Sequence, residues 1–252
     1  MSHRPLAEIR NLVLCGHGSA GKSSLIDQFL MKTGAVKHPV SVDAGTSVCD
    51  ADEIEKTHKY SVESHLVHFE HGGKYFQVLD TPGYPDFIGQ TIGALRGVDT
   101  AAIVINAQSG IEVNTRRVFN EAEKAGIGRV IILNKLDAEN VNFEGVLGHI
   151  KEAFGDRCML INVPIGLGAS FSGVVSVLNA DQNVAGAVVD PSTLSQSLLE
   201  SVVVADEEVL NRYFEGQMPT EEEIARLMSR SVAEGTVIPI FCVSAKSGIG
   251  LK

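Results

Sequence analysis

Apolar runs and helix-spaced apolar positions alternate along most of the chain. Five apolar runs have the length and composition of buried, mostly parallel strands: 12–15, 76–79, 101–105, 130–133 and 237–242. Four other segments carry apolar residues at the three- and four-residue spacing of a helix face: 22–31, 87–95, 114–124 and 143–154. This alternation predicts an α/β fold with a mostly parallel sheet and helices on both of its faces.

One hairpin is predicted inside this pattern. Residues 61–69 alternate between apolar and polar side chains, as a strand with one buried face does. The residues that follow, His71-Gly72-Gly73-Lys74, have the composition of a tight turn. We therefore expect 61–69 to pair with the strand at 76–79.

The regular alternation of strand-like and helix-like segments breaks between about residues 157 and 235. This segment contains two short strand-like pieces, 159–164 and 172–178, and then two long helical segments. Asp190 before Pro191 predicts the start of the first helix, and Thr220 with Glu223 forms a capping-box pattern at the start of the second. Gly235 closes the second helix. We interpret 157–235 as an inserted α+β subdomain between 1–156 and 236–252.

Composition narrows the class of protein without naming a function. The 252 residues are 44% hydrophobic and 21% charged, as in ordinary globular proteins. The sequence has neither a long apolar stretch nor the apolar core of a signal peptide, so we expect a cytoplasmic protein with no membrane partner. The four cysteines lack paired spacing, which argues against zinc and against a disulfide framework. A formal charge of −10 disfavours non-specific binding to nucleic acid.

Residues 16–23 read GHGSAGKS and match the phosphate-binding pattern G-x-x-x-x-G-K-[ST]. An apolar strand precedes the match and a helical segment follows it, which is the context that the pattern requires. Glycines let successive N–H groups converge on phosphate oxygens, Lys22 adds a mobile charge, and the Ser23 hydroxyl suits Mg²⁺. We predict nucleotide contacts from His17, Gly18, Ser19, Ala20, Gly21, Lys22, Ser23 and Ser24.

The stretch VLDTPGYPDF, at 78–87, ends an apolar run on Asp80. In phosphate-loop proteins an aspartate at the end of a neighbouring strand reaches Mg²⁺, usually through water. The backbone N–H of Gly83 can then face the γ-phosphate. Asp-x-Pro-Gly is also good turn chemistry, and its meaning here comes from the phosphate loop beside it.

Two further motifs concern the base. Asn134, Lys135 and Asp137 form N-K-x-D directly after a buried strand, where the carboxylate of Asp137 can accept from N1–H and the exocyclic amine of guanine. Adenine has an acceptor at N1 and lacks that amine, so Asp137 opposes it. After the last strand, a backbone N–H near guanine O6 is the expected contribution of Ser244, Ala245 and Lys246.

With these motifs in place, the chain resembles the translational GTPases, specifically elongation factor G and its divergent bacterial paralogues. The resemblance runs essentially end to end. It extends to NAQSGIEVNT at 106–115, to FSGVVSVL at 171–178, and to the helical stretches 200–214 and 220–232, which look like the insert of that family. It implies a P-loop NTPase G domain, GTP, GDP and Mg²⁺ as ligands, and a ribosome-bound, monomeric full-length protein. It also implies hydrolysis of GTP to GDP and phosphate.

Two serines depart from the family pattern. Ser19 stands where the family has an acidic residue in the phosphate loop. Ser61 stands at the switch threonine, whose hydroxyl Mg²⁺ needs; the resemblance thus implies Ser23, Ser61 and Asp80 as the metal set. An ordinary serine at a strand end is the other interpretation of Ser61.

Tyr84 is the departure with the largest chemical consequence. It occupies the place of the family's usual histidine, which positions the attacking water. A phenol can hydrogen-bond water, but with a pKa of about 10 it is a poor proton acceptor at neutral pH. The resemblance implies Lys22, Gly83 and Tyr84 as the catalytic set, with slow hydrolysis unless the ribosome stimulates it. A pure packing role for Tyr84 stays open.

Other functions also stay open. A GTP-dependent interaction switch with little hydrolysis fits Ser19 and Tyr84, and a ribosome-protection or release-factor type GTPase fits the same resemblance. A P-loop ATPase or kinase is the third class, and Asp137 argues against it. The resemblance further implies a last helix and more domains after Ser244-Ala245-Lys246, whereas the sequence ends at Lys252.

Overall fold

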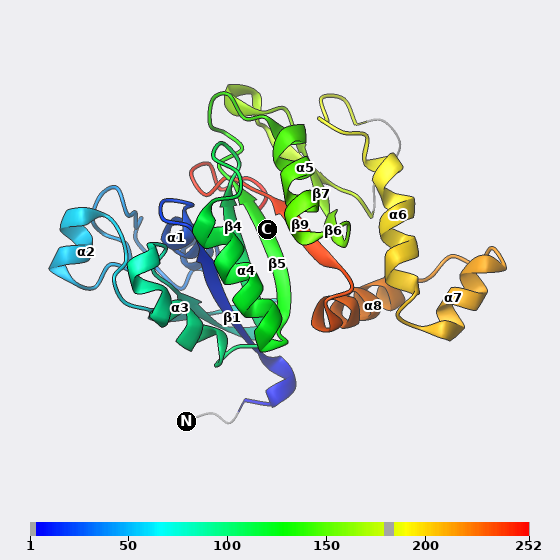
Figure 1. Cartoon of the computed structure of the whole chain (residues 1–252), viewed down its shortest axis with the longest axis horizontal. Helices are drawn as coiled ribbons and strands as arrows, with labels where there is room; N and C mark the ends of the chain where they lie inside the picture. The colour runs from blue at the N-terminus through cyan, green and yellow to red at the C-terminus, as the bar shows by residue number, and fades with distance from the viewer. Residues whose placement is uncertain (1–3, 179–183, 252) are drawn as a thin grey trace.

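A computed structural model describes residues 4–178 and 184–251. Its main sheet has seven strands in the order β2-β3-β1-β4-β5-β9-β6 (Figure 1). Only the β2–β3 pair of this sheet is antiparallel. The strand bounds are β1 Ile9–Gly16, β2 His65–His71, β3 Lys74–Asp80, β4 Thr100–Asn106, β5 Gly128–Asn134, β6 Cys158–Leu160 and β9 Ile238–Cys242. The predicted α/β class and mostly parallel sheet are confirmed.

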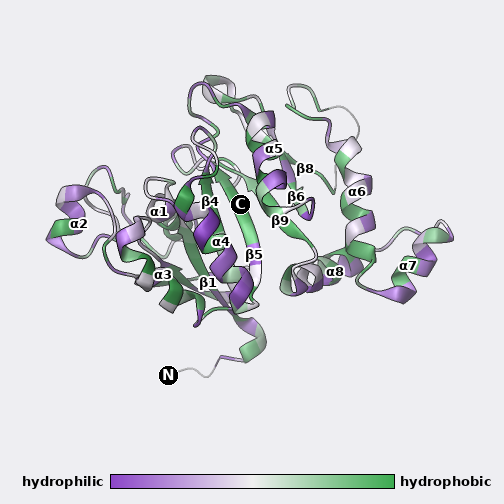
Figure 2. Cartoon of the chain, in the orientation of Figure 1, coloured by the Kyte–Doolittle hydropathy of each residue, from purple (hydrophilic) through white to green (hydrophobic). Residues whose placement is uncertain are grey.

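Helices cover both faces of this sheet because neighbouring residues of each central strand point to opposite sides. Val13 and Leu14 of β1 are both fully buried, yet they belong to separate cores. The core around Leu14 includes α1 (Lys22–Lys32), and the core around Val13 includes α3 (Ile88–Leu95), α4 (Val113–Ala125) and α5 (Phe143–Phe154). Figure 2 shows apolar central strands and a polar outer face on α4.

The predicted hairpin is present, with a shorter first strand. Gly72 and Gly73 both have positive φ, 55° and 71°, as the two central residues of a type I′ turn require. His71 and Lys74 are the last paired residues before this turn. The first strand begins at His65, so the expectation that it starts at residue 61 is wrong. Residues 61–64 form a loop whose backbone N–H groups at 62 and 63 bond a side chain instead.

The segment 157–235 is only partly separate from the main sheet. Its first strand, β6, pairs with β9 at the sheet edge, while β7 (Asn162–Ile165) and β8 (Gly173–Ser176) form a small antiparallel sheet. Three helices follow: α6 (Pro191–Val203), α7 (Glu207–Phe214) and α8 (Glu221–Glu234). They lie at the opposite end of the long axis from α2 (Glu53–His58) (Figure 1).

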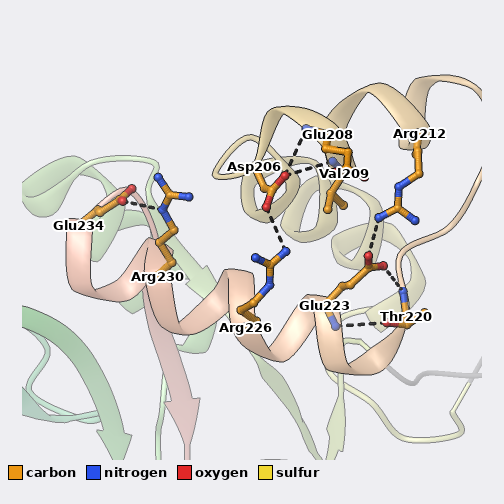
Figure 3. Close-up of polar contacts among 9 residues, drawn as sticks. All are labelled: Asp206, Glu208, Val209, Arg212, Thr220, Glu223, Arg226, Arg230 and Glu234. Atoms are coloured by element: carbon orange, nitrogen blue, oxygen red, sulfur yellow. Dashed lines mark hydrogen bonds and ion pairs between the residues drawn. The ribbon is translucent and has the colours of Figure 1, made fainter.

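The expectation of two long helices in this segment is wrong in one respect. The first helical stretch breaks between Val203 and Glu207, because the Asp206 side chain accepts the N–H groups of Glu208 and Val209 and starts a new helix. Asp206 also pairs with Arg226 of α8 at 2.9 Å (Figure 3). The cap signals at Asp190, Thr220 and Gly235 act as expected.

The fold brings five loops to one edge of the sheet. Parallel strands end on the same side, so the loops after β1, β3, β4, β5 and β9 meet there. Ligands of open α/β sheets bind outside these carboxyl ends. Short 3₁₀ turns at Leu6–Glu8, Pro85–Phe87 and Gly168–Ser170 complete the elements.

Candidate functional site

A cleft of about 880 Å³ lies at the carboxyl edge of the sheet. Most of the predicted site residues line it, although they come from separate stretches of the chain. These are Gly18, Ser19, Gly21, Lys22, Ser23, Ser24, Ser61, Gly83, Tyr84, Asn134, Lys135, Asp137, Ala245 and Lys246. The cleft is therefore the meeting point of the motifs that the sequence predicts.

The phosphate loop joins β1 to α1 and depends on unusual backbone angles. Ser19 has φ 59° and Gly21 has φ 94°, and a Cβ on Gly21 would collide with the Asn134 side chain. Lys22 begins α1 with only 6% of its surface exposed, and its Nζ donates to the His17 carbonyl at 2.9 Å. Burial lowers the pKa of Lys22, while the Asp80 charge opposes that change. A buried ammonium at a helix N-terminus favours an anionic ligand.

The predicted metal residues converge beside this lysine. Asp80 ends β3 fully buried, and its Oδ2 accepts from the Ser23 hydroxyl, which lies 3.3 Å from the Ser61 hydroxyl. Burial raises the pKa of Asp80, against the Lys22 charge, and Asp80 Oδ1 has no partner within the described chain. An unpartnered buried carboxylate oxygen next to two hydroxyls fits Mg²⁺, which takes oxygen ligands and retains several waters.

The other end of the cleft is organised by Asn134. Its Nδ2 donates to the Ala20 carbonyl at 2.9 Å, and its Oδ1 accepts from the Ala245 N–H at 2.8 Å. One buried side chain thus ties the phosphate loop to the loop after β9. Lys135 has φ 66°, a left-handed conformation that marks a tight bend after β5. Asp137 Oδ1 is buried and unpartnered within the described residues, so it can accept from a base.

Gly83 and Tyr84 form the wall next to the phosphate loop. A Cβ on Gly83 would collide with Lys22 Nζ and with the backbone of Gly18. The Gly83 carbonyl accepts from Asn114 Nδ2 at 2.8 Å. The Tyr84 side chain is 37% exposed, and its ring lies edge-on to Tyr60 with 4.8 Å between the centroids. Within the described chain no arginine lines this cleft.

Four predicted site residues lie behind the cleft surface. The His17 imidazole turns toward Glu112 of the loop before α4, with 3.3 Å between Nε2 and Oε1. Ala20 is buried and contributes its carbonyl, and the Ser244 hydroxyl accepts from the Ser247 N–H at 3.1 Å. Asp80, the fourth, sits beneath Ser23. Their influence on a ligand is through backbone groups or neighbouring side chains.

Sequence reasoning missed several residues that shape the site. Asp50 lines the cleft although only 3% of it is exposed, and burial followed by the Glu55 charge raises its pKa to about 6. Asn114 reaches the site from the first turn of α4, and Tyr60 reaches it from the loop after α2. The Asp52-x-x-Glu55 capping pattern was a usable signal for α2 and Glu55. The others carry no local signal, because only the fold brings them near the cleft.

The described residues contain neither a cluster of typical metal ligands nor a membrane-spanning helix. No group of three or more His, Cys, Asp or Glu side chains in 4–178 and 184–251 is arranged to hold a metal ion. This does not conflict with a Mg²⁺ site built from two hydroxyls, one carboxylate and water. Across the same residues, no helix combines the length and the apolar character that crossing a membrane requires.

Comparison with known proteins decides the family. The family model described as "Elongation factor Tu GTP binding domain" matches residues 7–252. The chain belongs to this family of GTP-binding domains. The domain is 32% identical to an elongation factor G-like protein of Thermotoga maritima, over 98% of the domain and 36% of that protein. For an elongation factor G-like protein of Mycobacterium tuberculosis the identity is 29%, over 96% and 35%.

A solved structure has the same fold. The GTP-binding domain matches a crystal structure of a Thermus thermophilus protein with a TM-score of 0.87 and 28% identity, over 97% of the domain and 38% of that chain. The domain thus spans little more than a third of the relatives that it matches. The resemblance to elongation factor G-like translational GTPases is confirmed.

Proposed function

We propose that this domain binds GTP and GDP with Mg²⁺ in the cleft and hydrolyses GTP to GDP and phosphate. The observation that carries the proposal is the double contact of the buried Asn134, which joins the phosphate loop to the loop after β9. Because of this tie, the phosphates and the base of one nucleotide fit along a single cleft. The base lies at Asp137 and the phosphates lie at Lys22.

Each part of the cleft has a separate task. Lys22 and the loop N–H groups hold phosphate oxygens, and the Gly83 N–H holds the γ-phosphate. Ser23, Ser61 and Asp80 would hold Mg²⁺, which when bound neutralises charge on the β- and γ-phosphates. Asp137 selects guanine through the N1–H and the exocyclic amine. Water attacks the γ-phosphorus while the bond from that phosphorus to the β–γ bridging oxygen breaks and GDP leaves. The Tyr84 hydroxyl orients the water without taking its proton, which passes to an oxygen of the released phosphate.

Hydrolysis by the domain alone is slow in this account. Tyr84 is a weak base, and the cleft has no arginine within the described residues to stabilise the transition-state charge. A positioned arginine or an equivalent charge adds about 10³–10⁵ in rate in other GTPases. The full-length protein would then act in the cytoplasm, with the ribosome supplying the missing stimulation.

Single-turnover hydrolysis of [γ-³²P]GTP by the domain, and by the full-length protein with and without ribosomes, tests this proposal. The variants are Tyr84→Phe and, as a control far from the cleft, Tyr213→Phe. We expect Tyr84→Phe to keep nucleotide affinity and to lower the stimulated rate by about tenfold, as the loss of one oriented hydrogen bond would. Equal stimulated rates for parent and Tyr84→Phe would assign Tyr84 to packing only.

A second candidate function is a GTP-dependent interaction switch that hardly hydrolyses GTP. The Tyr84 ring packs edge-on against Tyr60, an arrangement that favours this alternative because it can restrain the phenol. Tight GTP binding with no phosphate release in multiple-turnover assays, even with ribosomes, would support the switch. Ribosome-stimulated release would support the GTPase, whether it serves elongation, release or ribosome protection.

A further inference from the structure

We propose that Glu55 is a positioning residue that holds Ser61 beside Ser23, so that the γ-phosphate end of the cleft is complete only when the Glu55 carboxylate is in place. The inference rests on the proposed function, because it concerns how this site retains GTP with Mg²⁺. It adds a residue outside the motifs and outside the cleft lining.

The Glu55 carboxylate accepts hydrogen bonds from four backbone N–H groups on two separate stretches of chain. Oε1 accepts from Val62 at 2.8 Å and from Glu63 at 3.2 Å. Oε2 accepts from Ala51 at 3.2 Å and from Asp52 at 3.3 Å. Both oxygens are therefore occupied, and the carboxylate closes residues 51–63 into a loop.

Burial makes these contacts strong and specific. Only 1% of Glu55 is exposed, although α2 has six residues and its other side chains face solvent. His65 Nε2 lies 3.5 Å from Oε2 and is the one basic group paired with it in the described chain. Hydrogen bonds from N–H groups to a carboxylate are about twice as strong as neutral ones, and losing them leaves buried N–H groups without partners.

The contact to Val62 links Glu55 to the metal end of the cleft. Val62 follows Ser61 directly, so the bond to Glu55 fixes the peptide that connects them. Ser61 is 8% exposed, and its hydroxyl lies 3.3 Å from that of Ser23. Between Glu55 and Ser61 the chain turns through Lys59, which has the left-handed φ of 57°. The carboxylate therefore anchors the backbone on the C-terminal side of Ser61, while on the N-terminal side Tyr60 packs only through its ring on Tyr84.

The test compares Glu55→Gln with Ser61→Ala, with the double variant, and with Glu53→Gln, an exposed glutamate on the same helix. Dissociation of fluorescent GDP and of a non-hydrolysable GTP analogue is followed by stopped flow, with Mg²⁺ and with EDTA. We expect Glu55→Gln and Ser61→Ala each to speed release of the Mg²⁺-bound GTP analogue by about tenfold, which corresponds to one lost hydrogen bond. GDP release and the Glu53→Gln control should change less than about twofold.

The double variant decides whether Glu55 acts through Ser61. We expect it to release the GTP analogue no faster than the faster single variant, because residues that act on one interaction are non-additive. Multiplied effects would overturn the inference. So would an unchanged Ser61→Ala variant, or a Glu55→Gln variant that melts at lower temperature with the parent's ratio of GTP to GDP release.

If Glu55→Gln does not fold, the variant Glu55→Asp, which has a shorter acidic side chain, takes its place in the test. Glu55→Asp retains the charge but not the reach to both stretches, so it should shift GTP-analogue release in the same direction. An unshifted, folded Glu55→Asp would then overturn the inference. If the parent itself fails to bind GTP, the proposed function fails; if the parent and Ser61→Ala behave as expected and the Glu55 variants do not, only this inference fails.

Discussion

Replacement of Gly83 by alanine should separate GTP binding from GDP binding. A Cβ at this position would lie within 3.0 Å of Lys22 Nζ and of two backbone atoms of Gly18, so the wall of the phosphate loop must move. Forcing a methyl into a packed site costs about 1–3 kcal/mol, and the flexible end of Lys22 can relieve only part of it. The Gly83 N–H then leaves the place proposed for the γ-phosphate.

The magnitude follows from that cost. If this 1–3 kcal/mol destabilises the GTP-bound state, GTP affinity drops by roughly 5–150-fold. GDP has no γ-phosphate, so GDP affinity should drop by less than about threefold. Equilibrium titration of fluorescent GDP and a non-hydrolysable GTP analogue measures both. Gly93→Ala in α3 is the matched control, because its new Cβ would meet nothing within 4 Å. An unchanged ratio of GTP to GDP affinity in Gly83→Ala would show that the Gly83 N–H does not hold the γ-phosphate.

Three other predictions use the same titration or thermal unfolding. Lys22→Ala should weaken both nucleotides by about 2 kcal/mol or more, because phosphate charge loses its partner; parent-like binding would contradict a phosphate site. Asn134→Ala should weaken GDP and GTP equally, by about 1–3 kcal/mol, since it unties two loops that serve both. Burial and the negative charges of Glu55, Asp80 and Asp27 raise the pKa of Asp50 from 3.8 to about 6. The charge of His65 opposes this rise, but its effect is weaker. The folded, Mg²⁺-free protein therefore keeps this proton to higher pH than the unfolded chain does, and its stability should fall by about 1–3 kcal/mol as pH rises from about 4 to about 6. Asp50→Asn should make that slope shallower, because Asp80, whose pKa burial also raises, keeps its own share; equal slopes in the parent and in Asp50→Asn would contradict the prediction.

The parts of the fold and site that the sequence predicts are those encoded locally. The phosphate loop occupies one strand–turn–helix unit, so its pattern fixes both the backbone and the ligand chemistry. Periodicity and turn residues predict the positions of the buried strands along the chain and the hairpin at Gly72 and Gly73, but not the order of the strands in the sheet. The carboxyl ends of the parallel strands then bring the motifs to one edge, where they line the cleft.

The parts that sequence reasoning misses depend on contacts between distant residues. The Asp206 side chain caps α7 and also pairs with Arg226 of α8, which lies 20 positions away in the sequence (Figure 3). Asn114 reaches Gly83 across 31 positions of sequence. The strand β6 lies within 157–235 but pairs with β9 of the main sheet, so the first residues of this segment belong to the main sheet. We still propose that segment as an inserted subdomain, because β7, β8 and α6–α8 lie beyond the main sheet.

Competition between GTP and ATP measures whether the cleft selects guanine. Fluorescent GDP bound to the domain is displaced with unlabelled GTP, ATP or XTP, for the parent and for Asp137→Asn. We predict that GTP displaces the probe at least about 100-fold better than ATP, because Asp137 accepts two hydrogen bonds from guanine and opposes adenine. Asp137→Asn should lose guanine affinity and gain affinity for XTP. Equal displacement by GTP and ATP in the parent would contradict the account.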